Sequence, residues 1–220
     1  MKIQKNDIAR DENRRTGAAT CTCAQCTADD QCECVVALKK NTGIISGQLI
    51  SGYMRKYPAV VYVEEMAGMQ FSLTSKNPIL DQSHLIFIPH MLPVLVNSTV
   101  DFPNNDSVRH SVFSAPKSIQ SFNLGTYPVG VTKQVTFEKE GTSLLLCHVH
   151  AEMSAFVVVL QNPYFAKTDR GHFVIRNVSP GEYNLTFWNE KLKSKSIPVT
   201  VTAGETTQVQ FDKLTRKRGY

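Results

Sequence analysis

Short runs of alternating apolar and polar residues follow one another along the chain from Gly43 onward. Many of the apolar positions are β-branched, and glycine, proline and asparagine residues separate the runs. A period of two is typical of half-buried β-strands, in which successive side chains point to opposite faces. No stretch of useful length repeats with the period of an α-helix. The sequence therefore predicts an all-β fold.

The predicted strands fall into two groups. Residues 44–52 and 59–64 are β-branched runs around a polar segment and predict two strands, after which residues 65–83 are typical of an irregular connection. The second group contains strands near 84–88, 93–102, 109–114, 131–138, 143–147 and 154–160. Asn97–Ser98 and Glu140–Gly141 are turns that accept a left-handed backbone. This spacing favours an antiparallel β-sandwich.

Candidate chemistry is concentrated where the strand near 143–147 ends. Cys147 closes an apolar run, and His150 and Met153 follow it at spacings of three. A thiolate, an imidazole and a thioether are soft or borderline donors that suit copper rather than magnesium or calcium. Side chains alternate along a strand, so His148 points away from Cys147 and is a poor partner for the same ion. His150 and Met153 lie past the strand end, where a short loop can curl them back over the thiolate.

A tight copper site of this kind needs a second imidazole from elsewhere in the chain. His110, which follows an Asn/Asp-rich turn at 104–107, is the best candidate. Two histidines and a cysteine with a weak axial methionine form a blue-copper electron-transfer centre. One alternative is that the cysteine and the methionine only fill the core. Another is that Cys147 is a nucleophile with His110 or His150 as its base, but no hydrolase signature surrounds it.

Residues 84–161 resemble the cupredoxin family, the plastocyanin, azurin and amicyanin group. The resemblance is carried by Phe87–Val94, by the strand and turn at Val100–Asp106, and by the ligand loop from Cys147 to Met153. The two-residue gaps in that loop are closest to those of amicyanin. Two positions depart from the family pattern. Ser111 replaces a frequent Asn, and Ala151 stands where amicyanins carry Pro, which leaves the redox potential open.

This resemblance implies a Greek-key β-sandwich and one type 1 copper ion, bound by His110, Cys147, His150 and Met153. It also implies a one-electron carrier rather than an enzyme, with a redox partner protein, and with His150 as the exit route for the electron. Cupredoxins generally work outside the cytoplasm, so a periplasmic or other extracytoplasmic location is expected. No signal peptide is visible in the polar segment that follows Met1.

A second resemblance begins at Thr168, where the chain reads TD-x-G-x-F-x-I-x-N-V-x-P-G-x-Y through Tyr183. This pattern is similar to the carboxypeptidase regulatory-like domain, an immunoglobulin- or transthyretin-like β-sandwich. The two strands that precede the motif in that family are present at 43–64, about a hundred residues upstream. We infer that residues 43–66 and 163–212 form one discontinuous sandwich into which the cupredoxin-like part is inserted. The alternative is two consecutive domains, with 43–64 as extra strands on the cupredoxin-like part.

Residues 1–42 form a cysteine-rich tail that is predicted to be disordered. Its five cysteines are Cys21, Cys23, Cys26, Cys32 and Cys34. Thiolates at this density resemble metallothionein-like clusters, which bind Cu(I) or Zn. Incidental thiols, or two disulfides with one free thiol, are equally consistent with the spacing. The cluster suggests a second hypothesis, copper storage or delivery by a chaperone. A third is a non-redox scaffold that binds a partner protein.

Charge and composition exclude some other classes. The chain has 220 residues and a net charge of +5, to which the basic tail at 213–220 contributes. That tail is expected to be a solvated end, since no aromatic residues are interleaved with a basic stripe to favour nucleic acid. No run of about 18 apolar residues predicts a membrane span. Three histidines have no predicted partner: we expect His90 to be structural and His172 to be exposed, and His84 has no predicted role.

Overall fold

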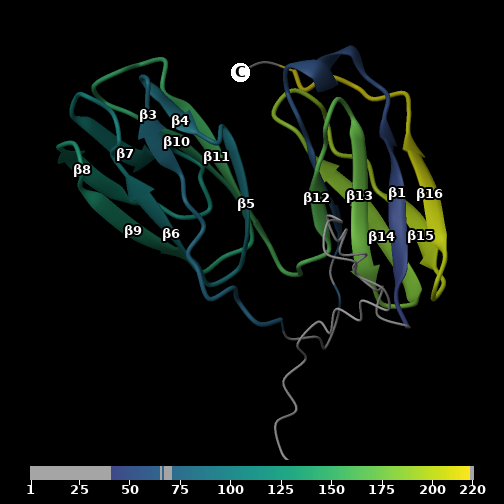
Figure 1. The fold of residues 1–220 in the computed structure, drawn as a ribbon. Coiled ribbons are helices and arrows are strands. Elements are labelled where there is room, and N and C mark those ends of the chain that lie inside the picture. Colours follow the sequence, from purple (N-terminus) through teal and green to yellow (C-terminus); the bar gives the residue numbers. More distant parts are fainter. Residues whose placement is uncertain (1–40, 65, 67–70, 219–220) are drawn as a thin grey trace, which may run out of the picture. The chain divides into compact units, whose positions relative to one another are not determined.

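The structure, a computed structural model, describes residues 41–64, 66 and 71–218 (Figure 1). These residues belong to one compact unit. The cysteine-rich segment and its five predicted metal-binding thiols lie outside the described residues. Within the described part of the chain, no helix is long and apolar enough to cross a membrane.

The fold is built almost entirely of β-strands, which confirms the predicted fold class. Only one short 3-10 helix, η1 (Gly52–Arg55), occurs among the described residues. The strands form several sheets, an architecture consistent with a cupredoxin-like β-sandwich. We call residues 81–160 the central sandwich, and we call the strands within 43–63 and 165–211 the terminal sandwich.

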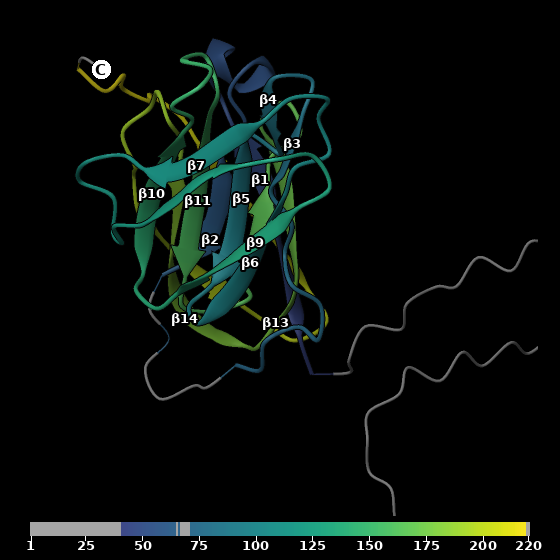
Figure 2. The ribbon, with the colours of Figure 1, turned by 90° about the vertical axis from the view of Figure 1, so that its left-hand side faces the viewer.

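The central sandwich contains nine strands. They are β3 (Asp81–Ser83), β4 (Ile86–Ile88), β5 (Met91–Leu95), β6 (Ser98–Pro103), β7 (His110–Ser114), β8 (Asn123–Tyr127), β9 (Thr132–Phe137), β10 (Gly141–Leu146) and β11 (Ser154–Leu160). One sheet has the order β5-β11-β10-β7-β8, and β3-β4 and β6-β9 form two smaller sheets. Figure 2 shows β6 and β9 side by side. Their antiparallel register places Val100 opposite Val135.

The core of the central sandwich explains these strands. Alternate residues of β6 are buried, as the period of two in the sequence predicts. Val100, Phe102 and Phe137 pack there with Leu145 in a single buried cluster. The same cluster includes Cys147 and Met153. The candidate metal-binding residues therefore lie at the edge of a close-packed core, which limits the movement of their side chains.

Several predicted strand boundaries need correction. The predicted strand 93–102 is two strands, because a turn separates β5 from β6 and contains Asn97, whose backbone is left-handed with φ of 68°. β8 has no counterpart among the predicted strands, because it is mostly exposed and polar and has no alternating apolar face. β3 lies in the segment expected to be irregular. β10 ends at Leu146, so Cys147 directly follows the strand instead of closing it.

The terminal sandwich combines strands from before and after the central one. It contains β1 (Gly43–Leu49), β2 (Val60–Val63), β12 (Phe165–Lys167), β13 (His172–Val178), β14 (Gly181–Trp188), β15 (Ile197–Val201) and β16 (Thr206–Phe211). Its two sheets have the orders β13-β1-β16 and β12-β2-β14-β15. Figure 1 shows the blue strand β1 between the green β13 and the yellow β16. Neither β1 nor β2 shares a sheet with a strand of the central sandwich.

Glycine is required where β1 lies closest to β16. A Cβ atom on Gly47 would lie 2.0 Å from the carbonyl oxygen of Val209, its parallel partner, so no larger residue fits. Most described residues of the basic tail are exposed, and two of them contact the terminal sandwich. Arg216 forms a β-bridge with Leu192, and Nζ of Lys217 donates to the carbonyl oxygen of Asn189 at 2.7 Å. The tail is therefore ordered against the terminal sandwich up to residue 217.

Candidate metal centre

Neighbouring strands bring the candidate ligands together. His110 is the first residue of β7, and Cys147 immediately follows β10. β7 and β10 pair antiparallel, with Leu146 opposite Phe113, so the start of one strand meets the end of the other. His150 lies in the turn that follows Cys147. The fold thus brings His110 of β7 next to the loop that begins at Cys147, 37 positions later in the chain.

Three possible ligand atoms converge at this point. Nδ1 of His110 lies 3.0 Å from Nδ1 of His150 and 4.0 Å from Sγ of Cys147. One ligand atom from each residue lies within 4.8 Å of the others, in a group that can hold a metal ion. In protein sites an imidazole nitrogen lies about 2.0 Å from a bound Zn²⁺ ion and a thiolate sulfur about 2.3 Å from it. If two such bonds meet at the metal at about 120°, the donor atoms are about 3.5 Å apart for two nitrogens and about 3.7 Å apart for a nitrogen and a sulfur. The separations of 3.0 and 4.0 Å are near these values, so small shifts of the side chains would place the three atoms around one small ion.

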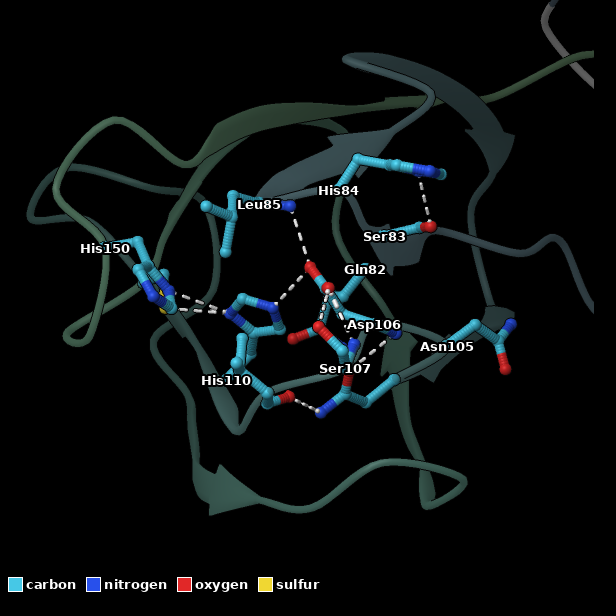
Figure 3. Close-up of polar contacts among 12 residues, drawn as sticks. Gln82, Ser83, His84, Leu85, Asn105, Asp106, Ser107, His110 and His150 are labelled. Atoms are coloured by element: carbon cyan, nitrogen blue, oxygen red, sulfur yellow. Dashed lines mark hydrogen bonds and ion pairs between the residues drawn. The ribbon is translucent and has the colours of Figure 1, made fainter.

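Asp106 fixes the orientation of the His110 ring. Its Oδ2 atom lies 2.9 Å from Nε2 of His110, and Figure 3 shows His150 on the other side of the ring. Nδ1 of His110 is thus left for Cys147 and His150. The same oxygen accepts the backbone N–H of Leu85 at 2.7 Å. The Leu85 N–H and the His110 ring hold the pKa of the Asp106 carboxyl well below its usual range. An ionised carboxylate behind a histidine fixes the tautomer and raises the basicity of the other nitrogen.

The loop before β7 holds this carboxylate in place. Oδ1 of the fully buried Asn104 accepts the backbone N–H of Asp106 at 3.1 Å. The Asn104 amide donates to the carbonyl oxygens of Val108 at 2.9 Å and Tyr127 at 3.2 Å. The turn is therefore rigid. The sequence shows the Asn/Asp-rich composition of this turn but does not by itself give Asp106 a role. Its position four residues before a candidate ligand is the signal that points to one.

Backbone donors surround the Cys147 sulfur. The Ser111 N–H lies 3.5 Å from Sγ, and the Ser111 hydroxyl donates to it at 3.7 Å while accepting the His148 N–H at 2.8 Å. Burial raises the pKa of Cys147, but the backbone N–H groups of Ser111, His150 and Val149 lower it by more, to about 6. The thiolate that a metal requires is therefore accessible near neutral pH.

Met153 and His148 occupy different environments. Met153 is 1% exposed in the core cluster that contains Cys147, and its N–H donates to the carbonyl oxygen of His150 at 3.1 Å. Its role as an axial ligand stays a prediction. His148 is exposed and stacks on Phe113, with ring centroids 3.8 Å apart and planes 6° apart. It does not belong to the three-donor group.

Three solved structures are similar to part of this chain. A purple cupredoxin from Nitrosopumilus maritimus is 26% identical, with a TM-score of 0.35, and the match covers 38% of this chain and 99% of that one. A reduced P52G mutant of amicyanin is 21% identical over 40% of this chain and 85% of that one, with a TM-score of 0.37. A copper-containing nitrite reductase from Thermus scotoductus SA-01 is 21% identical, with a TM-score of 0.39. That match covers 45% of this chain and only 25% of the reductase.

Comparison of the sequence with protein families gives a different match. The profile of polysaccharide lyase family 4, domain II, matches residues 147–209. This region begins at Cys147, crosses β11 and continues through most of the terminal sandwich. It covers well under half of the chain and assigns no family to the whole. No curated protein matches the sequence.

Proposed function

We propose that the central sandwich binds one type 1 copper ion through His110, Cys147 and His150, with Met153 as a weak axial ligand. The protein would then carry single electrons to or from a redox partner protein. The observation that supports this proposal most is the convergence of two imidazole nitrogens and one thiolate within 4.8 Å at the edge of a packed core. This donor set is the one that blue-copper centres use.

The surrounding residues suit a metal of this kind. Asp106 keeps Nδ1 of His110 free for the ion, and the donors around Cys147 stabilise its thiolate. When bound, copper would supply one-electron chemistry between Cu(I) and Cu(II). The protein contributes a rigid frame, because the ligand loop is tied to β7 through Ser111 and to the core through Met153. A frame that changes little between two oxidation states favours rapid electron transfer.

A carrier fits the exposure of the site better than an enzyme does. His110 is fully buried and Cys147 is 5% exposed, whereas His150 is only partly buried. If Met153 completes the set, protein side chains fill the four positions and leave no open position for a substrate. We propose that electrons pass through the His150 imidazole to a partner that docks over it. By analogy with cupredoxins we propose a location outside the cytoplasm.

Voltammetry of the copper-loaded protein tests this function. A carrier should give a reversible one-electron wave and retain its copper through repeated cycles. His150→Ala should lose the wave, whereas the matched variant His148→Ala should keep it, because His148 lies outside the three-donor group. Met153→Leu should keep the wave and raise its potential, since a thioether ligand is removed. An irreversible wave with loss of copper on reduction would argue against a carrier.

Copper handling is the second candidate, and it rests on the five cysteines between Cys21 and Cys34. A thiolate-rich segment favours soft Cu(I) and its exchange between sites. Removal of residues 1–40 separates the two functions. A carrier should keep its copper and its potential after the removal. A storage protein or chaperone should lose metal loading or the ability to transfer copper.

A further inference from the structure

His90 connects the ligand loop to the terminal sandwich. It lies in the turn before β5, and Nδ1 of its ring is 3.0 Å from the carbonyl oxygen of Ser154. Its Nε2 atom is 2.7 Å from a carboxylate oxygen of Glu190, which follows β14. Ser154 is the first residue of β11 and directly follows Met153. One histidine thus joins the end of the ligand loop to a carboxylate of the other sandwich, within one compact unit of the chain.

The contact with Ser154 extends the pairing of β5 and β11 towards the metal centre. That pairing begins with Met91 opposite Phe156. The carbonyl oxygen of His90 accepts the N–H of Phe156 at 2.8 Å, and the His90 ring then reaches the carbonyl oxygen of Ser154. The His90 side chain thus makes the contact with β11 that a further residue of β5 would make if the strand were longer. The loop from Cys147 to Met153 is therefore held by β10 at its start and by His90 at its end.

Glu190 is a fixed anchor rather than a mobile surface carboxylate. Its side chain is 11% exposed, and its other oxygen lies 3.2 Å from Nζ of Lys191. The preceding residue, the fully buried Asn189, donates to the carbonyl oxygen of Tyr57 at 2.8 Å and accepts the Leu192 N–H at 2.9 Å. The turn that carries Glu190 therefore has a defined backbone.

An aromatic contact reinforces the same connection. Phe156 in β11 packs against Trp188 in β14, with ring centroids 4.9 Å apart. The His90 ring meets Phe156 edge-on at 5.6 Å. Val158 and Leu160 of β11 are buried in one cluster with Val60 of β2. Contacts between the sandwiches thus run along β11 and reach the residue that ends the ligand loop.

We propose that Glu190 and His90 are a positioning pair through which the terminal sandwich sets the geometry of the loop carrying His150 and Met153. This inference rests on the proposed copper function. A weak axial bond responds to small shifts of its ligand, because no strong bond restrains the distance. Residues that orient a metal ligand from behind commonly affect both metal affinity and metal electronics. The role of the terminal sandwich would be to keep that loop in one conformation.

The test uses the full-length, copper-loaded protein and four variants. His90→Ala removes both contacts, Glu190→Gln keeps the shape and removes the charge, and the double variant combines them. Glu182→Gln, an exposed carboxylate of β14, is the matched control. The readouts are the relative intensities of the visible absorption bands and the rate of copper loss to a chelator. Thermal unfolding of the metal-free proteins shows whether the variants fold.

The two single variants should change the band intensities, and His90→Ala should lose copper about tenfold faster than the wild-type protein. The double variant should be no worse than His90→Ala alone, because both changes act through one contact. Glu182→Gln should match the wild-type protein. A coloured wild-type protein with unaltered spectra in every variant would overturn the positioning role alone. A colourless wild-type protein would instead overturn the copper function, and this inference with it.

Discussion

The Asp106 carboxylate lies 2.9 Å from Nε2 of His110, whereas the other ring nitrogen, Nδ1, lies near Cys147 and His150. The contact joins a charged group to the fully buried member of the three-donor group. Oδ2 of Asp106 accepts hydrogen bonds from this ring nitrogen and from the Leu85 N–H. Oδ1 accepts a hydrogen bond from the Ser107 N–H at 2.7 Å. The Ser107 hydroxyl also donates to Oδ1, at 3.4 Å, so backbone, hydroxyl and ring donors together hold the charge behind the ligand in place.

Asp106→Asn should weaken copper binding about tenfold and raise the reduction potential. An amide group cannot accept all of these bonds, because its nitrogen would face either the Leu85 and His110 donors or the Ser107 donor. The loss of a negative charge also disfavours Cu(II) relative to Cu(I). Competition titration and voltammetry measure the two effects.

Asp212→Asn is the matched control for this change. Asp212 is a half-exposed carboxylate paired with Lys195 in the terminal sandwich, so its replacement should alter neither quantity. If Asp106→Asn keeps both the affinity and the potential of the wild-type protein, the carboxylate does not tune the ligand.

The metal-free protein should titrate at Cys147 with a midpoint near pH 6, because donors to the sulfur lower the pKa to about 6. An unfolded cysteine has a pKa of about 8.5. The thiolate therefore contributes stability that is complete above about pH 8.5 and is lost as the pH falls through about 6. Ultraviolet thiolate absorbance follows the titration, and denaturant unfolding follows the stability.

Cys147→Ser should remove this pH dependence from the stability of the metal-free protein. Any remaining dependence between pH 6 and 8.5 would belong to other groups. A midpoint at the value of an ordinary thiol would mean that the N–H groups around the sulfur do not stabilise its charge.

Removing residues 67–161 should leave a folded terminal sandwich. β1 and β2 pair only with strands after residue 164, and Asn162 donates to the carbonyl oxygens of Val63 at 2.9 Å and Glu64 at 3.1 Å. The two cut ends therefore lie close together, and a short flexible linker can join them. A cooperative thermal transition followed by circular dichroism is the expected result. A shortened protein without such a transition would contradict the discontinuous domain.

The parts of the fold that sequence could predict are those with local periodicity. In β6 every second residue is buried, and the alternation of apolar residues shows it. β8 has no such face, since it contains Gly125 with φ of 64° and mostly exposed polar residues. It exists because it pairs with β7, where Tyr127 lies opposite His110. Long-range pairing of this kind leaves no local pattern.

The same division applies to the site. Cys147, His150 and Met153 share one short loop, so the sequence alone brings them together. The Asp106 carboxylate that orients His110 is held by a hydrogen bond from the Leu85 N–H, which is 21 residues away in the chain. The contact between His90 and Glu190 joins residues 100 positions apart, so no local pattern predicts a partner for His90. Donor types can be read from a sequence, whereas the groups that orient them depend on the tertiary fold.

Visible absorption during a copper titration tests the central claim most directly. A covalent copper–thiolate bond gives an intense visible band, so the wild-type protein should develop strong colour that saturates at one Cu(II) per chain. Cys147→Ser should remain colourless and His148→Ala should remain coloured. The five N-terminal cysteines are common to all three proteins, so the difference reports on Cys147 alone. A wild-type protein that develops no intense visible band with Cu(II), or a Cys147→Ser variant that keeps this band, would contradict the account.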